Sequence, residues 1–236
     1  EVLQPVAPVE IIWEPKIFLP FHPNGMKFVS VDKEGKETDQ WVVFSIGGGA
    51  LAEESDGASS VNTPDVYSMN SMTEILQWCE RTGKSYWEYV KECEDSDIWD
   101  YLQEVWKTMQ NAVKRGLEQE GVLPGPLNLR RKASTYYIRA SGYKQSLQSR
   151  GLVFAYALAV SEENASGGVI VTAPTCGSCG VMPAVLYHLA KSREFSDTRI
   201  LRALATAGLV GNIVKTNASI SGAEVGCQGE VGVACA

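Results

Sequence analysis

The residue types best suited to chemistry gather near the end of the chain, in the segment Asn217–Glu230. Here small and polar residues replace an apolar periodicity, and glycines stand at positions 222, 226, 229 and 232. Each glycine costs a helix up to about 1 kcal/mol relative to alanine. Two explanations for the four glycines stay open: close approach of the backbone to a bound group, or tight packing of helices in a crowded core.

Cysteines offer a second kind of chemistry. Cys176 and Cys179 form a Cys-x-x-Cys pair, a spacing typical of a redox pair or of half a zinc site. Cys227 and Cys235 are eight residues apart, which is about 12 Å of rise on a continuous helix, so they do not supply the second half of a zinc site. Small buried thiols in a helical core are the interpretation for the remaining cysteines, Cys79, Cys93 and Cys235.

Three further features could take part in a site. His22 stands in a turn-rich loop, where a lone histidine is either structural or an acid–base catalyst, and its place beside Asn24 favours function. The run Gly47–Gly49 follows a predicted strand but lacks the spacing of phosphate-binding loops. Lys215, next to the glycine-rich segment, is either a pyridoxal phosphate lysine or an ordinary helical lysine.

The composition limits the class of protein and its partners. With 44% hydrophobic and 21% charged residues, the 236-residue chain is typical of soluble globular proteins. Its longest apolar run, Leu152–Val160, is about half of the roughly 20 residues that a membrane helix needs. A net charge of −7 without a long basic cluster argues against nucleic acid as a partner. Six cysteines without a secretion signal predict reduced thiols in a cytoplasmic protein.

The elements that must position these residues change character along the chain. Alternating apolar residues in Lys27–Asp32 and Gln40–Ile46, joined by the turn Lys33–Lys36, predict a β-hairpin. The segment from Gly47 to Asn62 is rich in glycine, serine and acidic residues and is predicted to be a linker.

After Pro64 the periodicity becomes helical. Apolar spacing predicts a helix from Ile98 to Leu117, behind capping residues at 95–97, and further helices over 152–159, 182–191 and 198–214. The fold class is therefore α+β, with a small N-terminal β-rich part (residues 1–62) followed by a mostly all-helical part (residues 63–236).

Five segments in the same order along the chain resemble motifs of the bacterial iron-sulfur-dependent L-serine dehydratases (L-serine ammonia-lyases). They are His22–Met26, Ser45–Gly49, Glu120–Leu127, Val171–Thr175 and Asn217–Ala234. Together they span almost the whole chain, which is far more specific than any single pattern. The resemblance implies that residues 1–62 are what remains of a domain that binds or senses serine, and that residues 63–236 form a catalytic domain that holds a [4Fe-4S] cluster.

In this family three cysteines hold the cluster and leave one iron open, which acts as a Lewis acid on the serine hydroxyl. A base removes the α-proton, hydroxide leaves, and the aminoacrylate that forms hydrolyses to pyruvate and ammonia. The resemblance implies that Cys227 is a cluster ligand and that His22 is the catalytic acid or base. The residues it implies around the substrate are Asn24, Thr175, Asn217, Ser219 and Ser221.

The chain also departs from the family pattern. Relatives carry two further cluster cysteines downstream of the glycine-rich segment and histidine motifs upstream of residue 1, and Cys176 stands where asparagine or a small residue is expected. We therefore expect a central segment that lacks both ends and is inactive alone, because one thiolate cannot hold a three-cysteine cluster. The expected partners are L-serine and further copies of the chain, with no nucleic acid or membrane. The alternatives are a serine-sensing or helical binding module without catalysis and a pyridoxal phosphate dehydratase.

Overall fold

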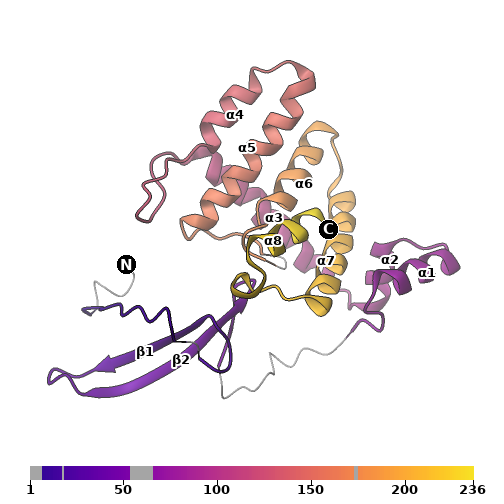
Figure 1. Cartoon of the computed structure of the whole chain (residues 1–236). Coiled ribbons are helices and arrows are strands. Elements are labelled where there is room, and N and C mark those ends of the chain that lie inside the picture. Colours follow the sequence, from indigo (N-terminus) through magenta and orange to yellow (C-terminus); the bar gives the residue numbers. More distant parts are fainter. Residues whose placement is uncertain (1–6, 18, 54–65, 173–174) are drawn as a thin grey trace. The chain divides into compact units, whose positions relative to one another are not determined.

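The computed structural model describes residues 7–17, 19–53, 66–172 and 175–236, which belong to two compact units (Figure 1). The first unit comprises Glu1–Ile46 and Leu51–Ser60, and the second comprises Gly47–Ala50 and Val61–Ala236. The described part of the chain combines one small sheet with a larger helical part, which confirms the predicted α+β class. None of the helices described is both long enough and apolar enough to cross a membrane.

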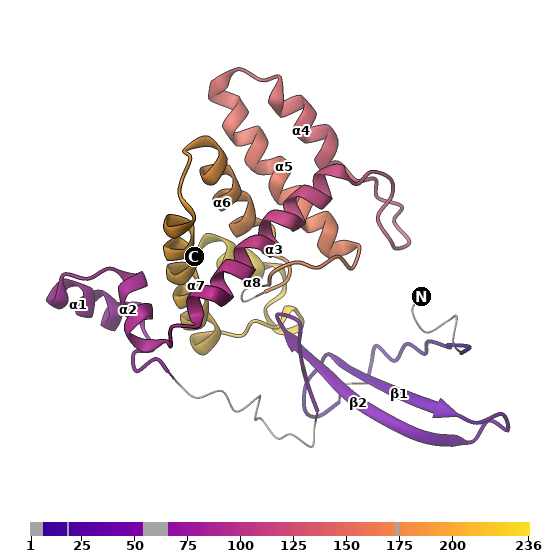
Figure 2. The same cartoon turned by 180° about the vertical axis from the view of Figure 1, so that it is seen from behind.

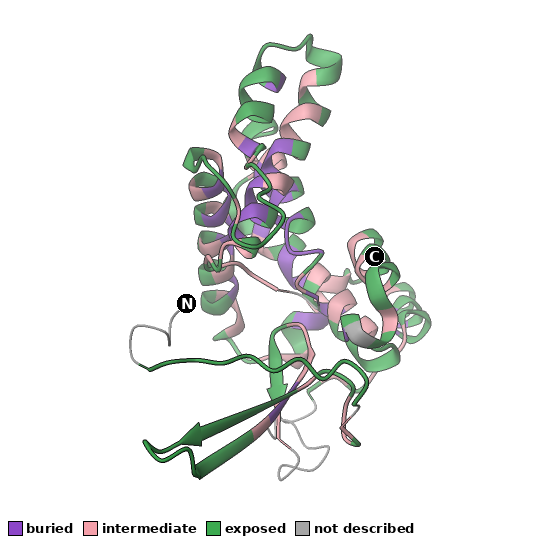
Figure 3. Cartoon of the chain, turned by 60° about the vertical axis from the view of Figure 1, so that its left-hand side comes forward, coloured by how far each residue is buried: buried purple, intermediate pink, exposed green. Residues whose placement is uncertain are grey.

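The first unit is built on an antiparallel hairpin of β1 (Gly25–Val31) and β2 (Glu37–Gly47). Asp32 closes the turn between them, because its Oδ1 accepts hydrogen bonds from the backbone N–H groups of Glu34 and Lys36, both at 2.9 Å. Most of the hairpin is exposed (Figure 3). The predicted hairpin is confirmed.

The predicted linker is wrong at its beginning. Gly47, Gly48 and Gly49 have φ values of 108°, 58° and 82° and form the turn that leads from β2 into β3 (Ala50–Ala52), the third strand of the sheet. Such φ values suit glycine because it has no Cβ. The segment is therefore a second tight turn, and residues 54–62 of the predicted linker lie outside the described residues.

The second unit carries the helices (Figure 2). Their bounds are Met72–Thr82 (α1), Tyr86–Cys93 (α2), Ile98–Glu118 (α3), Ala133–Ser141 (α4), Gln145–Ala165 (α5), Val181–Ser192 (α6), Asp197–Asn217 (α7) and Gly222–Cys235 (α8). The helices predicted from periodicity correspond to α3, α5, α6 and α7, although α5 begins seven residues before the predicted start at Leu152. Helices α1, α2, α4 and α8 were not predicted as separate helices.

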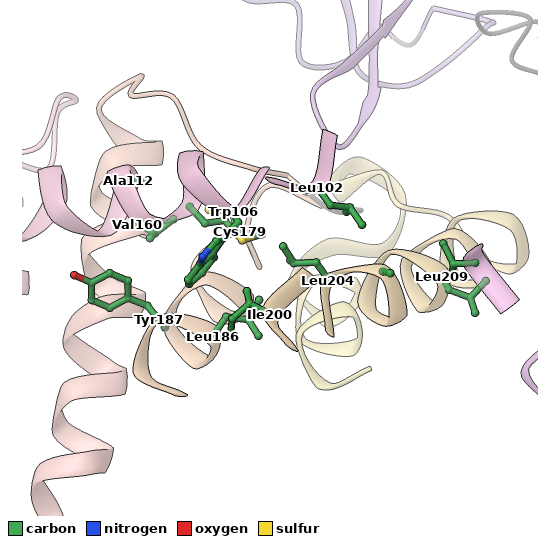
Figure 4. Close-up of a cluster of buried hydrophobic side chains, with 14 of the residues drawn as sticks. Leu102, Trp106, Ala112, Val160, Cys179, Leu186, Tyr187, Ile200, Leu204 and Leu209 are labelled. Atoms are coloured by element: carbon green, nitrogen blue, oxygen red, sulfur yellow. The ribbon is translucent and has the colours of Figure 1, made fainter. Parts of the chain in front are cut away.

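The core of the second unit forms around α3 (Figure 4). Leu102, Trp106, Met109 and Val113 share one face of α3, at the spacing of three and four residues that the helical period requires. They belong to the same buried cluster as Val160 of α5 and the α7 residues Ile200, Leu204 and Leu209. Complete burial of one such side chain contributes about 1.5–3 kcal/mol, so this face fixes the position of α3.

Helix α4 begins where a side chain of another helix caps it. The Oε1 atom of Glu162, in α5, accepts hydrogen bonds from the backbone N–H groups of Lys132 (2.6 Å) and Ala133 (3.3 Å). These N–H groups have no partner inside the helix. The capping side chain therefore lies 30 residues after Lys132 and 29 after Ala133 in the sequence. This separation explains why the local sequence shows no start signal for α4.

The neighbouring Glu163 is buried between two arginines. Its Oε1 lies 3.1 Å from Arg131 Nη1, and its Oε2 lies 3.0 Å from Arg115 Nε. The side chains of Arg131 and Glu163 are only 7% and 6% exposed, whereas that of Arg115 is 39% exposed. Arg131 Nη2 also donates to Ser166 Oγ at 2.6 Å. The Arg131–Glu163 pair therefore joins the start of α4 to α5 in a buried environment.

Replacing Gly116 with alanine is expected to destabilise the protein by about 1–3 kcal/mol, because α3 and α5 approach closely there. A Cβ at position 116 would lie 2.2 Å from the backbone oxygen of Ala159. Gly208 in α7 is the matched control, since a Cβ there would meet nothing within 4 Å, and alanine should stabilise α7 by up to about 1 kcal/mol. Urea unfolding of both variants measures the difference, and shifts of the same sign would contradict the close approach.

Candidate functional site

Three segments that are distant in sequence meet in the second unit. A Cβ at Gly47 would lie 2.5 Å from the backbone oxygen of Ile220 and 3.0 Å from Cα of Ser221, so the glycine turn lies directly against the start of α8. Thr172 Oγ1 donates to the backbone oxygen of Gly48 at 3.1 Å, across 124 residues of sequence. The turn after β2, Thr172 and the start of α8 therefore form one candidate site.

A carboxylate ties the same segment to α8. Thr175 Oγ1 donates to Oε2 of Glu230, and the backbone N–H of Ser178 donates to the same oxygen at 3.0 Å. Thr175 and Ser178 are buried, and their hydroxyl oxygens are 2.7 Å apart. Because an ionised carboxylate only accepts hydrogen bonds, the proton of Thr175 goes to Glu230 and Ser178 donates to Thr175.

Sequence reasoning missed Glu230 and Ser178. A usable signal was present for the first of them, because Glu230 is the only charged residue between Val225 and Ala236. A charge in such a run of small and apolar residues needs a partner when the run packs against the protein.

The other predicted substrate contacts in this unit differ in what they can still donate. Both amide hydrogens of Asn217 are used, toward the backbone oxygens of Asn70 (2.8 Å) and Ile213 (2.9 Å). Ser219 donates its hydroxyl proton to Glu224. Ser221 is buried at the N-cap of α8, and its hydroxyl makes no hydrogen bond with any residue that the structure describes. Among these residues, Ser221 keeps an uncommitted hydroxyl donor.

From Gly222 onward the glycine-rich segment lies in α8. Gly226, directly before Cys227, has φ 58° and ψ −157° and interrupts the regular helix. A Cβ added at Gly222, Gly226 or Gly232 would meet nothing within 4 Å. Tight helix packing therefore does not explain these three glycines within the described residues. Cys227 is exposed just after the interruption.

The thiols of the Cys-x-x-Cys pair are held in their protonated form. Burial, with a smaller contribution from Cys176 and Glu230, raises the pKa of Cys179 to about 11. Burial and the Glu230 charge also raise the pKa of Cys176. Redox exchange and metal ligation both use the thiolate, so this environment opposes either role for the pair.

The remaining cysteines correct one prediction. Cys79 and Cys93 are partly buried against the core, but Cys235 is exposed and is not a core thiol. Within residues 7–17, 19–53, 66–172 and 175–236, no three histidine, cysteine, aspartate or glutamate side chains gather so that they could hold a metal ion. The side chains described therefore do not supply a three-cysteine donor set by themselves.

His22 and Asn24 belong to the first unit. The Nδ1 atom of His22, which is half-buried, accepts a hydrogen bond from the backbone N–H of Asn24 at 3.1 Å. Asn24 is fixed to β2 in turn, since its backbone oxygen accepts from Ser45 N at 3.0 Å and its Nδ2 donates to the Ser45 oxygen at 3.4 Å. Because Nδ1 accepts, the neutral ring carries its proton on Nε2, which is the tautomer assigned from this bond.

Comparison with known proteins identifies two family models. The model described as the serine dehydratase alpha chain matches residues 33–236, and the model described as the serine dehydratase beta chain matches residues 4–56.

Individual relatives agree with these models. An L-serine dehydratase of Haemophilus influenzae is 41% identical over 233 residues, covering 93% of this chain and 51% of the relative. L-serine dehydratase 1 of Escherichia coli is 42% identical over 231 residues, covering 92% of this chain and 50% of the relative. The chain thus spans about half the length of the curated relatives it matches. Because the alpha-chain model alone covers well over half of the residues, the chain belongs to the serine dehydratase family, as its motifs predicted.

Proposed function

We propose that the protein containing this chain converts L-serine to pyruvate and ammonia. The observation that carries the proposal is the meeting of the glycine turn, Thr172 and the start of α8 at one place. These are parts of three of the segments that resemble serine dehydratase motifs, and proteins named L-serine dehydratase are similar over more than nine-tenths of this chain. We also place the protein in the cytoplasm.

The reaction sets the tasks for the side chains. Serine loses a proton from Cα and hydroxide from Cβ, and the aminoacrylate tautomerises to an imine that one water hydrolyses to pyruvate and ammonia. A site for this reaction needs a donor for the substrate carboxylate, a group that assists the departing hydroxide and a base that takes the Cα proton. We propose the first task for the Ser221 hydroxyl, which is uncommitted among the described residues. On the resemblance of its motif alone, we propose the second for Nε2–H of His22, whose ring accepts a hydrogen bond from Asn24 within the first unit.

The other predicted contacts take a different part in the proposal. Thr175, Asn217 and Ser219 already donate their protons within the protein. We propose that they shape the site rather than bind the carboxylate directly, because a hydroxyl has only one proton to give.

The cofactor is part of the proposal. We propose that Cys227 is one of three cysteine ligands of a [4Fe-4S] cluster and that the other two come from outside residues 1–236. Its exposure on α8 is compatible with that role, whereas the half-buried Cys176 and the buried Cys179, whose pKa values are both raised, are poor substitutes.

The 236-residue chain should therefore form no stable cluster when it is mixed with iron and sulfide under anaerobic conditions. The measurement is the visible absorption after desalting, together with pyruvate formation from L-serine. In the whole protein the absorption should form and should be lost on Cys227→Ser. Stable absorption and serine turnover by the 236-residue chain alone would contradict the proposed ligand set.

The proposed reaction is tested by following pyruvate formation from L-serine with the whole protein. Heat release on serine binding without pyruvate would favour a serine sensor instead. Trapping of a lysine-bound cofactor by borohydride would favour a pyridoxal phosphate enzyme, with Lys215 as the residue to examine by mass spectrometry.

We further propose that the protein is a homo-oligomer. Large apolar side chains are exposed on α4 and α5, among them Ile138 and Phe154, each 67% exposed. Exposed apolar surface of this kind favours association. Light scattering over a range of protein concentrations measures the oligomeric state.

A further inference from the structure

We infer that Glu230 is a positioning residue for the candidate site, which deepens the proposed function and rests on it. Glu230 lies in α8, the helix that also carries Ser221 at its N-cap and Cys227 one turn before Glu230. Its carboxylate does not lie in an open position. It contacts the Thr175–Ser178 turn that precedes α6, so it acts on the site through this turn.

The two hydrogen bonds to Glu230 converge on one atom. Thr175 Oγ1 and Ser178 N both donate to Oε2, and both donors belong to buried residues. Buried donors that lose their only acceptor are costly, because water does not replace it. Removing Glu230 therefore leaves Ser178 N without its acceptor and leaves the Thr175 hydroxyl with the Ser178 hydroxyl, 2.7 Å away, as its remaining partner.

Gly177 gives independent evidence that the turn is built around this carboxylate. A Cβ at position 177 would lie 2.5 Å from Cδ and 2.7 Å from Oε2 of Glu230. The chain thus has its smallest residue where the carboxylate reaches the turn. On the other side, Asn164 Nδ2 of α5 donates to the backbone oxygen of Cys176 at 3.3 Å, so the turn is held between α5 and α8.

The Thr175–Ser178 turn is also connected, through Thr172, to the glycine turn after β2. Thr172 and Thr175 lie three residues apart, and Thr172 donates to Gly48 while Thr175 donates to Glu230. The same short segment is thus bonded at one end to the glycine turn and at the other to α8. Glu230 thereby sets the distance between the two sides of the proposed serine site without contacting the substrate.

The test compares Glu230→Ala with Glu230→Gln in the whole protein. Since both bonds end on one oxygen, the amide oxygen of glutamine can accept them both, whereas alanine accepts neither. The alanine variant should raise KM for L-serine by about tenfold or more, with a smaller change in kcat, and glutamine should recover most of this loss. Equal losses in the two variants, or none in either, would overturn the positioning role.

A stability readout separates this inference from the proposed reaction. Urea unfolding of Glu230→Ala, Thr175→Val and the double variant forms a cycle that needs no substrate. The double variant should lose clearly less free energy of unfolding than the two single variants lose together, because both single changes remove the same hydrogen bond. Additive losses would overturn the inference even if serine is turned over, and strong coupling would uphold the link even if serine is not the substrate.

Gly177→Ala perturbs the same link while leaving Glu230 in place, and it keeps the inference testable if Glu230→Ala does not fold. The added methyl should displace the carboxylate and raise KM in the same direction as Glu230→Ala. Gly208→Ala serves as the control for a glycine replacement with open space around it. An unchanged KM in Gly177→Ala would contradict the inference.

Discussion

Replacing Arg131 with methionine is expected to lower the free energy of unfolding by about 3–5 kcal/mol. Methionine fills a similar volume, so the loss comes mainly from the charge. The replacement leaves the buried Glu163 carboxylate without its buried partner, while the half-exposed Arg115 compensates only in part. Urea unfolding followed by circular dichroism measures the change.

Arg115→Met is the matched control for this experiment. The Arg115 side chain is far more exposed, so water replaces much of its interaction with Glu163, and the expected loss is about 1 kcal/mol. Combining Arg131→Met with Glu163→Gln should recover part of the stability, because no buried charge is then left alone. Equal losses for Arg131→Met and Arg115→Met would show that burial does not set the strength of this network.

The accuracy of the sequence prediction depends on where the determining interactions lie. The β1–β2 hairpin is specified locally by alternating side chains and by Asp32, which caps its own turn. Helix α3 is specified by the spacing of its apolar face. Helix α4 was missed because its cap is Glu162, a side chain of α5 that cannot be recognised as a partner from the sequence around residue 133.

The candidate site shows the same division. Resemblance pointed to Thr175 and Ser221, but not to how their hydroxyls are used. The proton of Thr175 is committed to Glu230, whereas that of Ser221 has no acceptor among the described residues. Hydrogen bonds between residues more than 50 positions apart decide this difference, and periodicity carries no information about them. Glu230 was missed as well, although it is the lone charge in an uncharged run.

The glycine-rich segment shows how two explanations can be separated by structure. Tight packing and an open backbone both demand glycine, and the sequence does not distinguish them. Gly116 is the packed case, because its missing Cβ makes room for the backbone of α5. Gly222, Gly226 and Gly232 are the open case, since no described atom lies within 4 Å of a Cβ at these positions. We therefore connect these three glycines with access to the backbone of α8 and to Cys227.

Replacing His22 with alanine in the whole protein is expected to lower kcat for pyruvate formation by about 10²-fold or more. In the proposed reaction His22 assists the departing hydroxide through Nε2–H, because Nδ1 is occupied by the backbone N–H of Asn24. A neutral imidazole can serve in this way as a hydrogen-bond donor to developing charge. The loop should remain folded, since Asn24 keeps its two hydrogen bonds to Ser45.

Two amide variants at position 22 test which ring nitrogen acts. The amide nitrogen of glutamine can occupy the place of Nε2, whereas asparagine reaches only the place of Nδ1. His22→Gln should therefore recover about tenfold of the activity that His22→Ala loses, as expected for one restored hydrogen-bond donor, and His22→Asn should recover none. If His22→Gln is as inactive as His22→Ala, a hydrogen-bond donor cannot replace the ring, and His22 must transfer a proton. The tautomer fixed by Asn24 is then not the active form. Unchanged kinetics in His22→Ala would return His22 to a structural role, because a group that assists bond cleavage cannot be removed without slowing that step.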